Sequence, residues 1–130
     1  MKKIIFILLL AVSVVSCQKE TATTQETTTV NLTARVAIQA VPNSITQMGI
    51  WVQLQTQPTT LPQQLTANVQ YELFNGVNQF VSTNSYKATL NANLTANNVY
   101  TGVVVPGNFT VKNIKINSID FNNPNFVVKY

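Results

Sequence analysis

The sequence contains no histidine, a single cysteine and few charged residues. Charged side chains make up 9% of its 130 residues. Without histidine or a second cysteine, the chain cannot close an internal disulfide or build a zinc site from imidazole and thiolate ligands. It also has no glycine-rich phosphate loop, no Ser-His-Asp set and no His-Glu metal box. We therefore expect no enzymatic activity, no cofactor and no metal site.

Carboxylates are scarce as well. Only Glu72 and Asp120 of the four acidic residues lie beyond residue 29. Two carboxylates could in principle share general acid–base work. Each of these two fits better on the solvent-exposed face of a strand. Our interpretation is that the chain has no catalytic residues.

The positive charge is small and scattered. The formal net charge is +4, and two of the lysines, Lys2 and Lys3, stand at the very start of the chain. Removal of the first residues would leave six basic residues against four acidic ones, a net charge of +2. Nucleic-acid binding needs clustered basic residues, so no nucleic-acid partner is expected.

The first 17 residues carry the clearest signal in the sequence. Lys2 and Lys3 precede an apolar run over residues 4–15 that only Ser13 interrupts. This run is long enough for the hydrophobic region of a signal peptide and too short to span a bilayer. It is followed by Ser16 and Cys17, and a small residue at this place lets a signal peptidase reach the next bond.

Residues 14–17, Val-Val-Ser-Cys, resemble the lipobox of bacterial lipoproteins. The resemblance implies that residues 1–16 are a signal peptide and that Cys17 becomes a lipidated N-terminus with three acyl chains. Each buried CH₂ contributes about 0.8 kcal/mol, so several chains anchor a protein stably without a transmembrane helix. The alternatives are an ordinary secretory signal with a chance cysteine and an uncleaved membrane anchor.

Residues 17–29 are expected to form a flexible, threonine-rich tether that starts at the lipidated cysteine. Segment 18–29 has no apolar periodicity and cannot bury enough surface to offset the entropy of ordering. Lys19 and Glu20 are similar to the export tags of surface lipoproteins in the Bacteroidota; the alternative is a plain spacer. These features predict a lipid-anchored protein of the cell envelope, at the outer membrane, with the periplasmic or surface face left open.

Residues 30–130 read as one all-β domain. Apolar and polar residues alternate strictly over 30–40, which predicts a strand with one buried and one exposed face. Proline and asparagine clusters separate the following runs. The expected strands cover residues 30–40, 48–55, 67–73, 78–83, 86–94, 99–105, 109–116 and 126–130, with 117–125 as a polar loop or a short strand.

Turn chemistry supports this division. Turns are expected at 42–44, at 84–85, at 96–98 and at 106–108. Asn75-Gly76 predicts a hairpin, because both residues accept positive φ. The apolar phase shifts at Asn113, which predicts a bulge. The expected core contains Val36, Ile38, Ile50, Val52, Val69, Tyr71, Leu90 and Val111, with Leu61 and Leu65 tucked against it.

Two all-β families are similar to parts of this domain. Residues 71–76, Tyr-Glu-Leu-Phe-Asn-Gly, resemble the central hairpin of fibronectin type III and immunoglobulin-like domains, and Leu94 and Tyr100 have the spacing of their tyrosine corner. Segments 98–100 and 105–111 resemble the end of transthyretin-like domains. Both resemblances imply an antiparallel Greek-key β-sandwich of about seven strands, and we favour the immunoglobulin-like one.

These features predict a lipid-anchored envelope module that binds another envelope protein or a glycan, with unknown specificity. The alternative is a structural subunit of a surface assembly or filament. Aromatic side chains could offer a glycan platform, but most of them alternate with core positions, and we assign them to packing. They are Trp51, Tyr71, Tyr86, Tyr100 and Tyr130.

Overall fold

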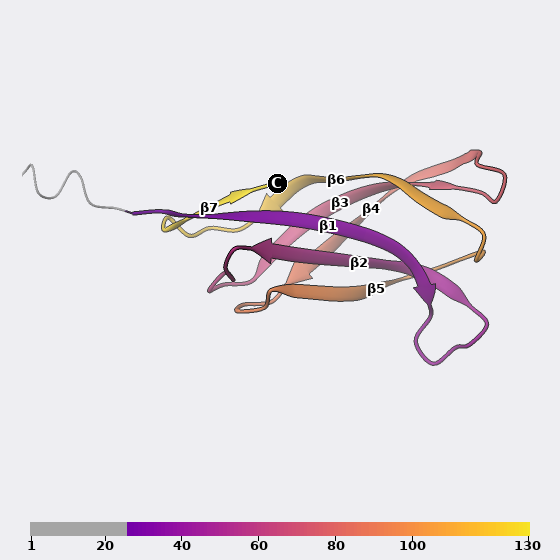
Figure 1. Cartoon of the computed structure of the whole chain (residues 1–130), viewed down its shortest axis with the longest axis horizontal. Helices are drawn as coiled ribbons and strands as arrows, with labels where there is room; N and C mark the ends of the chain where they lie inside the picture. The colour runs from indigo at the N-terminus through magenta and orange to yellow at the C-terminus, as the bar shows by residue number, and fades with distance from the viewer. Residues whose placement is uncertain (1–25) are drawn as a thin grey trace, which may run out of the picture.

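The computed structural model describes residues 26–130 and shows seven strands in that range, with no helix (Figure 1). The expected all-β fold is therefore confirmed. The predicted signal peptide and most of the predicted tether lie outside the described residues. The strands are β1 (Thr28–Ala40), β2 (Met48–Gln57), β3 (Leu65–Phe74), β4 (Phe80–Leu90), β5 (Ala96–Val105), β6 (Thr110–Asp120) and β7 (Phe126–Lys129).

The strands form a sandwich of two sheets. The first sheet has the order β5-β2-β1-β7 and the second has the order β4-β3-β6. The chain crosses from one sheet to the other after β2, β4, β5 and β6. Across the sandwich, β1 lies against β6, while β2 and β5 lie against β4.

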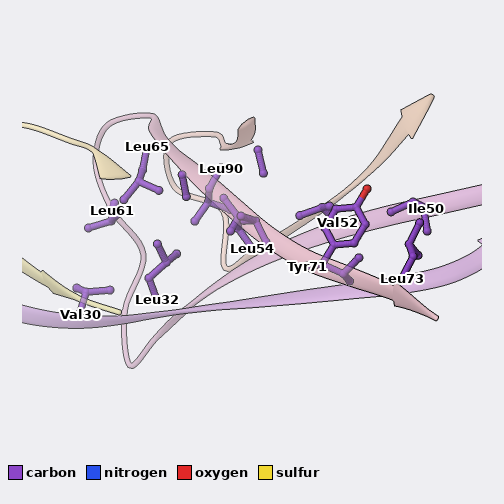
Figure 2. Packing of buried hydrophobic residues seen from close by; sticks show 14 of the residues in the cluster. Val30, Leu32, Ile50, Val52, Leu54, Leu61, Leu65, Tyr71, Leu73 and Leu90 are labelled. Atoms are coloured by element: carbon purple, nitrogen blue, oxygen red, sulfur yellow. The ribbon is translucent and has the colours of Figure 1, made fainter. Parts of the chain in front are cut away.

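One strand pair departs from the expected antiparallel arrangement. β7 runs parallel to β1 and pairs only with its first residues, Thr28–Asn31. β6 ends where β3 and β1 begin, because Asp120 pairs with Thr66, and the loop 121–125 reverses the chain there, so β7 runs in the same direction as β1 (Figure 2). The remaining pairs are antiparallel.

The core fills the space between the two sheets. Figure 2 shows Val30 and Leu61 at one end and Ile50 and Leu73 at the other, with Leu54 between them. The tucked positions of Leu61 and Leu65 are confirmed. So is the burial of six expected core residues, Val36, Ile50, Val52, Val69, Tyr71 and Leu90.

Two expected core residues are only half-buried. Ile38 and Val111 pack against the core but keep part of their surface exposed. Ile38 lies on the part of β1 beyond β7, and Val111 lies on β6, the edge strand of the second sheet. An edge strand has a neighbour on one side only, so its inward side chains are covered less completely.

The hairpin between β3 and β4 lies where it was expected, but its turn differs. Asn75 accepts a hydrogen bond from the amide of Asn78 at 2.9 Å, and positive φ falls on Asn78 (62°) instead of on Asn75 and Gly76. The side-chain oxygen of Asn75 also accepts hydrogen bonds from the amides of Val77 and Gln79. Asn75 therefore acts through its side chain, which closes the turn.

Two expected turns are wrong. Residues 84–85 lie inside β4, and residues 96–98 belong to β5. The chain reverses between these strands instead, at 91–94, where Asn93 adopts φ 63° and donates its amide to the carbonyl of Leu61. Asparagine favours turns but is also found in strands. Here residues 84–85 pair with β3 and residues 96–98 pair with β2, and this pairing places them in strands.

The expected bulge at Asn113 is confirmed. The register of β6 against β3 shifts between the pairs Gln70–Lys115 and Glu72–Lys112, and Asn113 has φ 53°. A second shift follows near Asn117. These two bulges keep Ile116 and Ile119 on the inner face over a strand that runs further than expected, to Asp120.

Candidate functional site

The lipidation site expected at Cys17 lies outside the described residues. The domain that follows it begins with β1 at Thr28, two residues earlier than expected. Within residues 26–130, no helix is long and apolar enough to cross a membrane. The same range holds no group of three or more His, Cys, Asp or Glu side chains that could bind a metal ion.

The structure separates the two carboxylates of the domain. Glu72 pairs with Lys112 in the β3–β6 register, and Asp120 pairs with Thr66. The two carboxylates are therefore six positions apart along β3, which corresponds to about 20 Å of strand. Glu72 instead accepts a hydrogen bond of 2.6 Å from the side-chain amide of Asn113. The two carboxylates do not form a pair.

The aromatic residues are spread over different faces. Trp51 and Tyr100 pack together on the outer face of the first sheet, with ring centroids 5.5 Å apart. The indole N–H of Trp51 donates to the carbonyl of Ala40. Tyr71 is buried, which raises the pKa of its hydroxyl. Tyr86 packs against the core and Tyr130 is exposed. They do not form one row on which a glycan could stack.

Tyr100 also does not mark a corner between strands. It lies in the middle of β5 and pairs directly with Trp51 of β2. In the immunoglobulin family the corner tyrosine stands near the start of the sixth strand. The spacing between Leu94 and Tyr100 thus corresponds to a turn followed by an ordinary strand position.

Three loops lie at the end of the sandwich opposite to the start of β1. We call this surface the distal end; it consists of loops 41–47, 75–79 and 106–109 (Figure 1). The side chain of Asn108 lies directly against Gly76. Gly107 lies close to Met48 at the start of β2. Loop 106–109 therefore contacts loop 75–79 on one side and the start of β2, which follows loop 41–47, on the other.

The distal end exposes apolar side chains. Ile45 is fully exposed and Val77 is 73% exposed; Phe80, the first residue of β4 directly after loop 75–79, is 57% exposed. Phe80 packs edge-on against Phe74, and the ammonium of Lys112 lies 4.6 Å from the Phe74 ring centre. Contacts between a cation and a ring hold the ring in place. Ile45 lies in loop 41–47, while Val77 and Phe80 lie at the hairpin between β3 and β4, so two loops at the same end of the sandwich expose apolar side chains.

A polar hollow of about 320 Å³ lies on the outer face of the second sheet. Hydroxyl and amide side chains line it together with Lys87 and Asp120, one charge of each sign. Hydrogen-bonding groups of this kind suit water or a polar ligand equally. The lining residues are Thr66, Asn68, Ser85, Lys87, Ser118, Ile119 and Asp120.

No family model, no curated protein and no solved structure matches this chain. The residues of the distal end were not predicted from the sequence. A usable signal was present, because Ile45 and Val77 are apolar residues inside segments of turn-forming residues, where burial is not expected.

Proposed function

We propose that this protein is a lipid-anchored, non-enzymatic binding module of the cell envelope, held in the outer membrane by acyl chains on Cys17. We further propose that its distal end contacts another envelope component, either a protein or a glycan. The observation that carries the binding role is the group of exposed apolar side chains at the distal end, above all Ile45 and Val77.

The position of these side chains supports the proposal. β1 contains 13 residues and runs from the start of the domain to the distal end. A strand of this length extends about 40 Å. An anchor at Cys17 would attach to the end of the domain where β1 begins, so the distal end is the end of the domain opposite to the anchor and is left free to contact another envelope component.

The order of the strands supports an immunoglobulin-like domain type. Immunoglobulin domains place their first, second and fifth strands in one sheet and their third and sixth strands in the other. The same division is found here. The fourth strand pairs with the third and the seventh pairs with the first, so two strands are placed differently from the constant-type domain. A transthyretin-like type is the alternative.

The proposal can be tested with the full chain in a Gram-negative host. A photo-crosslinking side chain is introduced at Ile45 on the distal end and, as a matched control, at the exposed Leu94 at the opposite end. We expect membrane-dependent crosslinks to discrete envelope components from position 45 and not from position 94. Equal crosslinking from both positions would contradict a binding role for the distal end.

The same experiment distinguishes the alternative role as a structural subunit. A subunit of a homopolymer would crosslink mainly to further copies of itself and give a ladder of regular mass increments. Crosslinks to a different molecule would support the binding module. The variant Cys17→Ser separates anchoring from binding, because it removes the acyl acceptor and leaves the residues of the distal end unchanged.

A further inference from the structure

Part of the edge of β1 has no neighbouring strand. On one side β1 pairs with β2 from Asn31 to Ala40. On the other side β7 covers only residues 28–31, and no other strand of residues 26–130 continues along that side. The backbone N–H and C=O groups that point outward between Thr33 and Gln39 therefore remain available for a further strand.

This edge is more regular than the edges formed by β4, β5 and β6. The pairing of β1 with β2 contains no bulge. β6 carries two register shifts, and β5 carries one near Gly102, whose φ is 85°. On β4, the side-chain amide of Asn97 donates to the carbonyl of Thr89 at 2.7 Å. Bulges and occupied carbonyls discourage strand addition, and the open edge of β1 has neither.

β7 shows that a strand can pair with this side of β1. Its side chains also show which residues such a strand needs. Phe126 and Val128 point inward and pack against the core, while Val127 and Lys129 lie outward. Beyond the end of β7, Ala34 and Ile38 of β1 are only half-buried, as is Val111 of β6 in the opposite sheet. A second strand with apolar residues at alternate positions would cover these side chains as β7 covers its own section.

On the solvent-facing side of the first sheet, the open edge of β1 is flanked by positive charge. Lys129 of β7 lies just before this edge begins, and the exposed Arg35 lies within it. The register neighbours of Arg35 on β2 are glutamines and Trp51, so no carboxylate faces it from the sheet. An incoming strand with acidic residues on its outward positions would complement this charge.

We propose that the open edge of β1, residues 33–39, accepts an extended segment of another protein in which apolar residues alternate with outward-facing acidic residues. Addition of such a strand uses main-chain hydrogen bonds for affinity and alternate side chains for specificity. A second copy of this chain fits less well, because antiparallel pairing of β1 with itself would bring two Arg35 side chains onto the same face. This surface is separate from the distal end, so its test is independent of the binding proposed there.

The test uses the detergent-solubilised full chain and two synthetic peptides of about nine residues, a usual strand length. In one peptide valine alternates with glutamate, and in the other with lysine. Hydrogen exchange is measured at single-residue resolution. We expect the acidic peptide to slow the exchange of alternate amides within residues 33–39 by at least about tenfold, and the basic peptide to have no effect.

Matched charge reversals check the specificity. Arg35→Glu should weaken the binding of the acidic peptide by about tenfold or more and let the basic peptide bind instead. Lys87→Glu, the same change at an exposed position of β4, should leave both results unchanged. Absence of protection with either peptide, or protection on β4 or β6 instead, would overturn the proposal. Protection of residues 33–39 that grows with protein concentration alone would assign the edge to a second copy and overturn it as well.

Discussion

Tyr100 of β5 lies across Gly49 of β2 on the outer face of the first sheet. A Cβ atom added at Gly49 would come within 2.5 Å of Cε2 of Tyr100 and within 2.9 Å of the carbonyl oxygen of Val103. The absence of a side chain at position 49 therefore gives the tyrosine ring its place beside Trp51. One glycine and two aromatic residues fix the packing between these two strands.

The first prediction follows from this contact. Gly49→Ala should lower the free energy of unfolding by about 1–3 kcal/mol, because a closely packed site must shift to hold the extra methyl group. Part of this loss should vanish in the background of Tyr100→Ala. Urea denaturation of the two single variants and the double variant would measure the coupling. Strictly additive effects would show that the ring does not restrict position 49.

The second prediction concerns Thr56, the polar side chain buried in the core. Its hydroxyl oxygen has no hydrogen-bond partner among the described residues. Thr56→Val keeps the shape and removes a polar group that lost its water on folding. The variant should therefore be more stable by about 1 kcal/mol in urea denaturation. Thr56→Ser, the control, keeps the hydroxyl and should not be stabilised. A valine variant less stable than the wild type would contradict this account.

The third prediction concerns the bulge in β6. Asn113 has φ 53°, a conformation that glycine adopts freely and β-branched residues strongly disfavour. Asn113→Val should be less stable than Asn113→Gly by about 1–2 kcal/mol. Both variants lose the hydrogen bond to Glu72, so this hydrogen bond does not contribute to the difference between them. At Asn117, where φ is not positive, the order should reverse, because valine suits a strand better than glycine. Thermal denaturation of the four variants would decide.

The fourth prediction concerns pH. Burial raises the pKa of Tyr71 above its ordinary value of 10.0. Between the ordinary pKa and this raised pKa, the unfolded chain binds fewer protons than the folded one. The contribution of Tyr71 to the free energy of unfolding is therefore complete below about pH 10, and it is lost as the pH rises further. Tyr71→Phe should show a smaller loss of stability between pH 9 and about pH 11. Parallel pH profiles for both proteins would contradict this.

Local patterns predicted the strands but not all of their limits. The alternation in β1 and the phase shift at Asn113 are properties of neighbouring residues, and both predictions are confirmed. The turn expected at 84–85 failed, because Asn84 and Ser85 pair with Tyr71 and Gln70 of β3, a partner that no local signal identifies. The parallel pairing of β7 was missed for the same reason.

The candidate sites differ in the same way. The lipidation prediction for Cys17 depends on a short contiguous motif, so the sequence alone supports it. The open edge of β1 depends on where β7 stops, which is a property of the assembled sheet. The distal end likewise needs three loops that are distant in sequence to lie at the same end of the sandwich. Surfaces of this kind become visible only once the strand order is known.

The central claim is that Cys17 is the lipidated N-terminus of the mature protein. The direct measurement is mass spectrometry of the N-terminal peptide from membranes of a host that processes lipoproteins. We predict a peptide that begins at Cys17 and carries diacylglycerol on its thiol, together with an uncleaved signal in Cys17→Ser. An unmodified N-terminus at any other residue, or a Cys17 thiol without lipid, would contradict the account.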